Sequence, residues 1–480
     1  MHKYCLLFLA LFFISKSNAF GQQNSTLFFM HSTPQANFVN PAVRNECNWI
    51  IGLPVISSLH FNYGNSAFSI NQLFKKQQGN SYIFNGDKVI SKLGRVNFLT
   101  SEFHTNLFYL GFWVKENFIT FSINEKADLF VTYPHDFFAL GWQGNTQFEG
   151  QTAKLGSTGI FFNYRREFAI GLARQTQKDL AWGVRGKILF GKLNTSMSKS
   201  TIDLYTEPLT YDLDFTTNWQ LNTSLPIDVV RNANNNFESA NGKGSIGSLL
   251  FNRKNIGLAF DLGFIKYRDD KITISGSVLD LGLIYWSSNP NSFSQNGNYS
   301  YRGPLADTIN VGNYFSDLIH GMKNQFGIKV DQKSYLTFLS PMVYLGATYS
   351  IREDLNAGFL LSGRINRYRT TAGATISLNK TFHKTNSVSI SYSYIYRDFK
   401  NIGAGVKLGK KPVQFYAVSD NILGFIKPLD TRNLNLRFGL QINFGCNRKE
   451  LSKDCGCYWV NQAEERRIRD NKLLKREKEN

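Results

Sequence analysis

Apolar and polar residues alternate strictly near the end of the chain, over residues 434 to 444. One face carries Leu434, Leu436, Phe438, Leu440, Ile442 and Phe444, and the other carries Asn435, Arg437, Gly439, Gln441 and Asn443. A period of two predicts a β-strand whose two faces meet different surroundings. This pattern raises the question of which surface needs a fully apolar face on one side and a fully polar one on the other.

The same alternation recurs at residues 182–190, 209–216, 372–379 and 387–396. These runs are longer than the five or six residues of an average strand in a soluble sheet. A tilted strand needs about 9–11 residues to cross a bilayer. We therefore predict an all-β fold, a transmembrane antiparallel β-barrel of about 14–16 strands. A soluble β-protein with long hairpins also alternates, and it stays the alternative.

In such a barrel the apolar face meets lipid and the polar face meets a wet lumen. Candidate lumen-facing charges on the alternating segments are Arg185, Lys187, Asp212, Asp214 and Arg437. We expect residues 434–444 to form the last strand. Its outward residues, ending in an aromatic, resemble the signal by which outer-membrane barrels are recognised for assembly: Phe438, Leu440, Ile442 and Phe444.

The first residues read as an export signal. A charged start is followed by an apolar run from Tyr4 to Ile14 and by small residues near Ala19, which is the pattern of a cleaved signal peptide. We predict a signal peptide over 1–21, an N-terminal segment over 22–47, a barrel over 48–445 and a charged periplasmic tail over 446–480. No later stretch reaches the length of apolar sequence that a spanning helix needs.

The N-terminal segment contains the sequence Asn-Pro-Ala at Asn40, Pro41 and Ala42. Pro41 lacks a backbone donor and pushes Asn40 toward an extended conformation. The side chains of Asn37 and Asn40 can close turns on their own backbone. A compact segment of this kind either folds into the barrel mouth as a plug or forms an ordinary turn into the first strand.

The pattern breaks in three places. We expect the two largest loops near residues 218–248 and 287–313, where polar residues accumulate. At residues 133–145 we expect a short helix or an inward loop, because Pro134 suits a helix start and Gly141 suits a helix end.

The formal net charge is +19 over 480 residues. Nucleic acid is the usual partner of a basic protein, but export to the envelope excludes it. A basic lumen or an anionic membrane surface accounts for the charge more simply. The expected partners are outer-membrane lipid, including lipopolysaccharide, and other envelope proteins.

Sequence motifs of catalysis or metal binding are missing. The seven histidines are scattered, and no histidine pair has helical metal-ligand spacing. Asp212 and Asp214 share one strand face, which suits a hydrated lumen wall better than a catalytic pair. We therefore predict no enzyme activity, no cofactor and no metal.

Four cysteines follow the export signal, at positions 47, 446, 455 and 457, and they allow three pairings. Closure of the barrel places the first strand beside the last strand. Because Cys47 precedes the former and Cys446 follows the latter, we hypothesise a Cys47–Cys446 disulfide at the periplasmic end. A zinc site in residues 446–457 is the weaker alternative, since no histidine lies nearby.

Three stretches carry a family resemblance: NFVNPA at 37–42, residues 258–286, and residues 420–445. They resemble a largely uncharacterised family of Bacteroidota outer-membrane barrels, similar to the PorP/SprF-type barrels of type IX secretion and gliding. The segments are more remotely similar to FadL-like transporters of hydrophobic solutes, which also carry an N-terminal Asn-Pro-Ala. The resemblance implies a fold and a location in the outer membrane, and it supplies no catalytic residues.

Two functions follow as hypotheses. The first is a structural or accessory subunit of an envelope complex for secretion, gliding or outer-membrane assembly, which the resemblance to PorP/SprF-type barrels implies. The second is a passive channel or a transporter of hydrophobic solutes.

Overall fold

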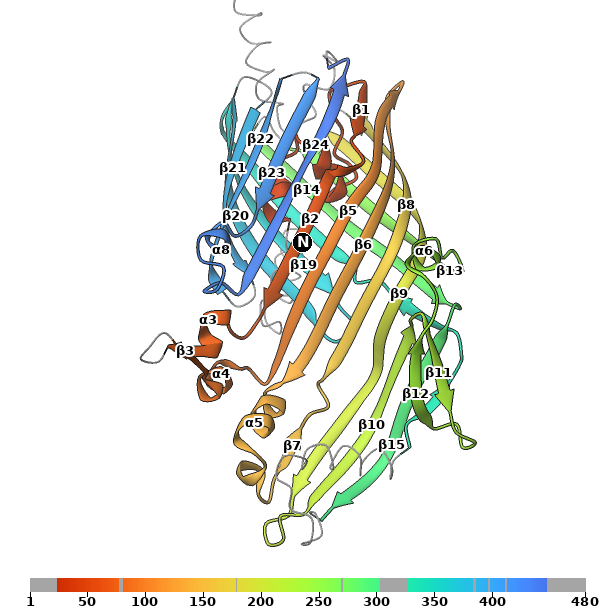
Figure 1. The fold of residues 1–480 in the computed structure, drawn as a ribbon. Coiled ribbons are helices and arrows are strands. Elements are labelled where there is room, and N and C mark those ends of the chain that lie inside the picture. The colour runs from red at the N-terminus through yellow and green to blue at the C-terminus, as the bar shows by residue number, and fades with distance from the viewer. Residues whose placement is uncertain are drawn as a thin grey trace, which may run out of the picture.

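The computed structural model describes residues 24–76, 81–177, 179–268, 271–302, 327–382, 386–395, 398–410 and 412–446. The predicted export signal and charged tail lie outside these residues. Most of the described chain forms one large antiparallel sheet that curves and closes on itself (Figure 1).

Closure gives a barrel with 14 strand positions. The first position is shared by β1 (Trp49–Gly52) and β2 (Val55–Asn65), which follow each other along the same neighbours. The other positions are, in chain order, β5 (Val96–Val114), β6 (Asn117–Pro134), β8 (Gly159–Gln177), β9 (Leu180–Thr206), β13 (Asn255–Tyr267), β14 (Ile272–Trp286), β18 (Met342–Arg352), β19 (Leu355–Ile365), β20 (Thr370–Phe382), β21 (Asn386–Ile395), β22 (Asp398–Lys410), β23 (Val413–Ser419) and β24 (Asn433–Phe444).

The seam is the pairing of the last strand with the first. Phe444 lies opposite Trp49, and Phe438 lies opposite Leu59, in antiparallel register. A disulfide joins Cys47 to Cys446 just beyond this seam, which is the pairing that the sequence suggested. Closure removes the sheet edge that an open β-structure would expose.

Strand faces follow the predicted alternation. On β24 the asparagines, the glutamine and Arg437 are buried inside the barrel, whereas Leu434 to Phe444 present their apolar side chains outward. On β21 the serines 387 to 393 point inward, and Val388, Ile390 and Tyr392 are exposed outside. The exposed belt continues around the wall through residues such as Leu258, Phe260, Leu262, Leu283, Leu345, Phe359, Ile376 and Leu378.

Such a belt is the surface that lipid covers in a membrane barrel, and the prediction of a transmembrane antiparallel barrel is confirmed. Within the described residues, no helix is both long enough and apolar enough to cross a bilayer.

The two ends of the barrel differ. At one end the strands are joined by a few residues, for example Lys115–Glu116 between β5 and β6 and Glu353–Asp354 between β18 and β19. The Cys47–Cys446 disulfide lies at this short-turn end. Longer connections gather at the opposite, loop end, where they include α5 (His135–Gln143) and α8 (Leu423–Ile426). Such an asymmetry is typical of outer-membrane barrels, whose short turns face the periplasm.

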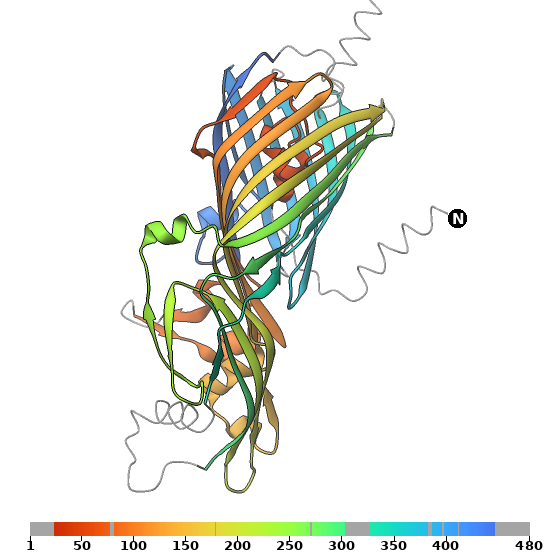
Figure 2. The ribbon, with the colours of Figure 1, turned by 90° about the vertical axis from the view of Figure 1, so that its right-hand side faces the viewer.

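A second part of the sheet extends beyond the loop end (Figures 1 and 2). β9 has 27 residues, so at about 3.3 Å per residue it spans roughly 90 Å. Its first half pairs with β13 in the barrel, and its second half pairs with β10 (Leu213–Ser224). β10 in turn pairs with β15 (Pro290–Tyr301). We call this part, with the short strands β7 (Thr152–Lys154) and β16 (Lys329–Asp331), the extension.

One face of the extension is covered. Leu213 and Phe215 on β10 pack with Leu204 and Tyr299, and Leu140 from α5 lies against them. The helix in residues 133–145 was expected, but it runs on past Gly141 to Gln143 and ends at Gly144, whose φ of 77° suits glycine. It lies beside the extension rather than inside the barrel (Figure 1).

The placement of Asp212 and Asp214 in the lumen was wrong. Asp212 lies between β9 and β10, and Asp214 is exposed on the extension, where it accepts a hydrogen bond from Ser300 Oγ at 2.5 Å. The strand also begins later than expected, since Leu209 and Tyr211 precede β10 and are exposed. Alternation in this segment comes from packing under α5, which a sheet outside the barrel produces as readily as a barrel strand.

Smaller elements surround the loop end. They are α3 (Ile70–Leu73), β3 (Phe74–Lys76), β4 (Tyr82–Phe84), α4 (Gly86–Lys92), η2 (Thr146–Phe148), β11 (Ile227–Arg231), β12 (Phe237–Gly242), α6 (Ile246–Leu250) and β17 (Tyr335–Phe338). The polar stretches expected as long loops therefore contain regular structure, because β10, β11 and β12 occupy much of 218–248 and β15 begins at Pro290.

Candidate functional site

The N-terminal segment fills the lumen (Figure 2). α2 (Ser25–Phe29) and the 3-10 helix η1 (Pro34–Phe38) fold inside the barrel, and nearly every residue from Ser25 to Asn45 is buried. Leu27 to Met30, Val39, Ala42 and Val43 form one apolar cluster with wall residues such as Tyr344, Leu360 and Tyr416. Of the two readings of this segment, the plug describes what the structure contains, and residues 24–47 are called the plug below.

The Asn-Pro-Ala turn holds its own shape through side-chain hydrogen bonds. Asn40 Oδ1 accepts from the backbone N–H of Ala42 at 3.0 Å, and Asn37 Nδ2 donates to the carbonyl of Val43 at 2.8 Å. The turn also reaches the wall, because Asn40 Nδ2 donates to the carbonyl of Phe264 on β13 at 3.2 Å. Gly183 on β9 leaves room for it: a Cβ there would collide with the backbone of Pro41.

Arg185 on β9 is the main polar link between wall and turn. Its Nη2 donates to both the carbonyl and the side-chain oxygen of Asn37, each at 2.5 Å. Its Nη1 donates to Asp261 Oδ2 on β13 at 3.0 Å. Ser277 Oγ on β14 adds a bond to the carbonyl of Val39 at 2.6 Å. The guanidinium of Arg185 therefore bonds both to the plug, at Asn37, and to the wall, at Asp261.

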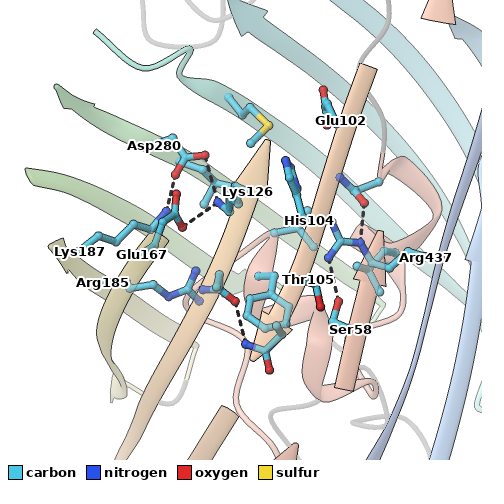
Figure 3. Close-up of a pocket in the computed structure, with 18 of the residues that line it drawn as sticks. Ser58, Glu102, His104, Thr105, Lys126, Glu167, Arg185, Lys187, Asp280 and Arg437 are labelled. Atoms are coloured by element: carbon cyan, nitrogen blue, oxygen red, sulfur yellow. Dashed lines mark hydrogen bonds and ion pairs between the residues drawn. The ribbon is translucent and has the colours of Figure 1, made fainter. Parts of the chain in front are cut away.

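The start of α2 meets Asp420, which follows β23. Asp420 Oδ2 accepts from the N–H of Asn24 at 2.6 Å, and Oδ1 accepts from the N–H of Thr26 at 2.8 Å. A carboxylate at a helix start satisfies N–H groups that have no partner within the helix. Arg437 Nε on β24 donates to Asn24 Oδ1 at 3.0 Å (Figure 3).

α2 lies against a wall of small residues. The Cβ position of Gly346 on β18 is taken by the ring of Phe28, and that of Gly405 on β22 by the sulfur of Met30. Thr26 Oγ1 is 2.7 Å from Ser391 Oγ on β21. We call the inward residues of β18 to β22 around α2 the glycine–serine wall: Gly346, Gly358, Ser377, Ser389, Ser391, Gly403 and Gly405.

The opposite side of the lumen is charged. Lys187 Nζ on β9 lies 2.7 Å from Asp261 Oδ1 and 2.5 Å from Asp280 Oδ1. Lys126 on β6 pairs with Glu167 at 3.0 Å, and Arg165 on β8 pairs with Glu167 at 2.8 Å. With Asp128, which Arg165 Nη1 contacts at 2.6 Å, these residues form what we call the ionic wall. Figure 3 shows four of them: Lys126, Glu167, Lys187 and Asp280.

A β-bulge aims two of these carboxylates inward. The pairing of β13 with β14 shifts register between Phe260 and Leu262, and Asp280 takes a left-handed φ of 57°. Bulges often re-aim a side chain in this way, and aspartate tolerates such a φ. The backbone N–H of Asp280 then donates to Asp261 Oδ1 at 2.7 Å, which fixes both side chains near Lys187.

Between plug and ionic wall there is a cavity of about 50 Å³, lined among others by Lys126, Glu167, Lys187, Asp280 and Arg437. A cavity of this size holds water molecules but no larger solute.

The plug brings little charge to this cavity. Burial lowers the pKa of His31 to about 4, so this ring is neutral at neutral pH.

Of the residues singled out from the sequence, Arg185, Lys187 and Arg437 point into the lumen. Phe438, Leu440, Ile442 and Phe444 point outward on β24. The partners Lys126, Arg165, Glu167, Asp261 and Asp280 were missed. Their inward placement follows the same alternation, but the bulge at Asp280 and the register between distant strands give no signal in one sequence.

No curated protein matches the chain. Solved structures give weak matches. A FadL homologue of Pseudomonas aeruginosa is 10% identical, with 89% of this chain and 97% of that chain covered and a TM-score of 0.41. The toluene transporter TodX of P. putida is 9% identical, with 86% and 92% covered and a TM-score of 0.36. These scores are too low to support an inference about this chain.

The family comparison is firmer. The model of a family of unknown function, DUF5723, matches residues 41–420, which include the Pro41–Ala42 end of the plug turn and every barrel strand from β1 to β23. The chain belongs to this family of unknown function, DUF5723.

Proposed function

We propose that this protein is an outer-membrane channel for small solutes, in which the N-terminal plug blocks the lumen and moves aside when a solute passes. The apolar belt and the asymmetric ends support a place in the outer membrane, with the disulfide end toward the periplasm. The observation that carries the proposal is that residues 24–47 fill the lumen, while the charged side chains of the ionic wall pair with one another and not with the plug.

The ionic wall supports a movable plug. Lys187, Asp261, Asp280, Lys126 and Glu167 pair with one another across the strands. Displacement of the plug would therefore leave these charges paired. Arg185, Asp420 and Arg437 do bond to the plug, and each keeps a partner on the wall when the plug leaves: Asp261, Asn435 and Ser58, respectively. A buried charge that lost all its partners would cost several kcal/mol, about 3–5, and this arrangement avoids that cost.

The lining favours a polar solute. A lumen with Lys126, Glu167, Lys187 and Asp280 around its residual cavity holds water better than hydrocarbon. Cations and anions alternate there, so the wall does not select one sign of charge. Hydrophobic solutes, suggested by the sequence as an alternative cargo, fit this lining less well.

The test is solute flux through proteoliposomes that contain the mature chain with C455S and C457S. A sugar, an amino acid and an aromatic hydrocarbon form the panel. In the same background, V39C and S277C are introduced together and joined by a short bis-maleimide across the contact between Ser277 and Val39. V39C alone, treated with the same reagent, is the matched control.

We expect the unlinked protein to pass the polar solutes and the joined pair to block them, with V39C alone unchanged. Vesicles with the unlinked protein that are no more permeable than empty vesicles, for every solute, would overturn the proposal. Equal flux before and after joining would overturn the role of the plug.

A second candidate is an accessory subunit of an envelope complex, in line with the resemblance to PorP/SprF-type barrels. The extension favours it, because a sheet that projects beyond the loop end offers a surface for another protein (Figure 2). The test is co-purification from the native membrane with and without residues 460–480. Loss of partners in the truncated chain would support docking through the tail, and unchanged partners would leave the extension as the docking surface. A chain that purifies without partners in both forms would argue against this second candidate.

A further inference from the structure

Two histidines from different strands meet inside the barrel. His60 on β2 and His104 on β5 are directly opposite each other in the antiparallel register. Their ring centroids are 5.3 Å apart. Because opposite residues in a β-pair project to the same side, both rings lie on the lumen face of the wall.

A carboxylate completes the group. Glu102 is two residues before His104 on β5, and residues at i and i+2 of a strand share a face. His60, Glu102 and His104 each offer one ligating atom within 4.8 Å of the others. Two imidazoles and one carboxylate are a common ligand set for divalent transition metals.

The environment of His60 points to a ligand independently of the spacing of the three residues. Its side chain is 1% exposed, and neither of its ring nitrogens has a hydrogen-bond partner among the described residues. Glu102 Oε2 lies 3.6 Å from His60 Nε2, which is longer than a hydrogen bond. Buried polar groups are almost always paired, so a fully buried imidazole without a bond points to a missing ligand.

The other two residues are oriented as ligands usually are. His104 Nε2 is 2.7 Å from Asp128 Oδ1, so Nδ1 is the ring nitrogen that would ligate a metal while this contact is kept. Asp128 is itself held by Arg165 at 2.6 Å. Arg364 holds Glu102 through Oε1, so Oε2 is left toward His60. A carboxylate on the far nitrogen of a histidine and a hydrogen-bonded ligand carboxylate are typical of built metal sites.

We propose that His60, Glu102 and His104 bind a divalent first-row transition metal, with zinc as the probe ion. Zinc bonds of about 2.1 Å require ligand atoms about 3.4 Å apart, so the group must contract from 4.8 Å by small side-chain movements. Glu102 and His104 also line the lumen cavity, which gives room for a water molecule as the fourth ligand (Figure 3).

Two cations limit the strength of this site. Arg364 pairs with Glu102, and Arg437 lies nearby with its Nη1 bonded to Ser58 Oγ at 3.1 Å. Glu102 and Asp128 offset part of that charge. The site therefore binds zinc more weakly than a ligand set without arginines. The inference is independent of whether the barrel transports a solute.

The test is zinc binding to the mature chain in detergent, in the C455S/C457S background and without an affinity tag. Affinity is measured by competition with a chromogenic chelator, and the absorption spectrum of added cobalt reports the ligand geometry. H60Q, H104Q and the double variant remove the histidines, and H135Q on α5 is the matched control at a distant histidine.

We expect about one zinc per chain and a four-coordinate cobalt spectrum for the unaltered histidines. Each single variant should weaken zinc binding at least about tenfold, and H135Q should leave it unchanged. A chain with all its histidines that binds no zinc, or that binds it as weakly as the double variant, overturns the proposal even if a variant folds poorly.

Discussion

The two sides of the lumen fill the interior of the barrel in different ways. The glycine–serine wall offers small side chains, and α2 of the plug lies directly against it, with Phe28 over Gly346 and Met30 over Gly405. The ionic wall offers long charged side chains that reach one another, such as Lys187 to Asp261 and Asp280. The plug covers the glycine–serine wall, whereas the side chains of the ionic wall pair with one another.

This difference indicates which part of the barrel interior can move at the lowest cost in free energy. A helix packed on glycine and serine loses dispersion contacts when it moves. The carboxylate of Asp420 loses the N–H groups of α2 but keeps the hydrogen bond from Asn435 Nδ2. A displaced member of the ionic wall would leave an unpaired charge behind. The plug can therefore be the moving part of this barrel, and the ionic wall the fixed one.

The largest effect is expected from breaking the ionic wall. Lys187→Met removes one cation from between Asp261 and Asp280, which keep Arg185, Lys126 and Arg165 as ion-pair partners among the described residues. The free energy of unfolding should fall by about 3 kcal/mol, because a buried carboxylate is left with fewer partners. Denaturant titration of the protein in detergent micelles measures it.

The matched control for that variant is Lys243→Met, which removes a cation from the exposed ion pair of Lys243, just after β12, with Asp228 on β11. Exposed pairs contribute at most about 1 kcal/mol. Equal losses of the free energy of unfolding in the two variants would show that the ionic wall stabilises the protein no more than a surface ion pair does.

A smaller effect is expected on the glycine–serine wall. Gly346→Val places methyl groups where Phe28 now lies, with the new Cβ 2.6 Å from the ring. Overpacking of this kind costs about 1–3 kcal/mol, and it should push α2 away from the wall. Limited proteolysis within residues 24–47 and solute flux should both increase.

The control here is Gly186→Val on β9, whose Cβ position faces outward and meets only the ring of Phe260 at 4.0 Å. That variant should fold and leak as the unaltered protein does. If the Gly346→Val protein passes no more solute and is no more sensitive to protease than the unaltered protein, the position of α2 does not depend on the glycine–serine wall.

The smallest effect is expected at the start of α2. Asp420→Asn keeps the shape of the side chain but removes the charge that accepts from Asn24 and Thr26. Loss of such a cap costs about 1 kcal/mol. Hydrogen exchange of the α2 amides should accelerate, whereas Asp430→Asn, which changes an exposed carboxylate in the same loop, should leave exchange unchanged.

Much of the fold follows from the sequence alone. Alternation at 182–190, 372–379 and 387–393 correctly separates lipid-facing from lumen-facing residues, because a closed barrel has different surroundings on its two faces. The strand at 434–444 and the place of Cys47 and Cys446 follow from the requirement that first and last strands meet.

The failures have one physical cause. Alternation reports that a face is buried, but it does not report what buries it. Leu213 and Phe215 alternate because α5 covers them, so Asp212 and Asp214 were wrongly assigned to the lumen. In the same way, His60 and His104 are 44 positions apart, and only the register of β2 with β5 brings them together.

The most direct test of the account is a nitroxide scan along β21, with one label at a time from Ser387 to Ser393 in protein reconstituted into bilayers. Collisions with oxygen, which concentrates in lipid, should peak at positions 388, 390 and 392 and fall at the four positions between and beside them. Collisions with a water-soluble nickel reagent should stay low at those three positions. An absence of alternation, or high nickel accessibility at 388, 390 and 392, would contradict a lipid-embedded barrel.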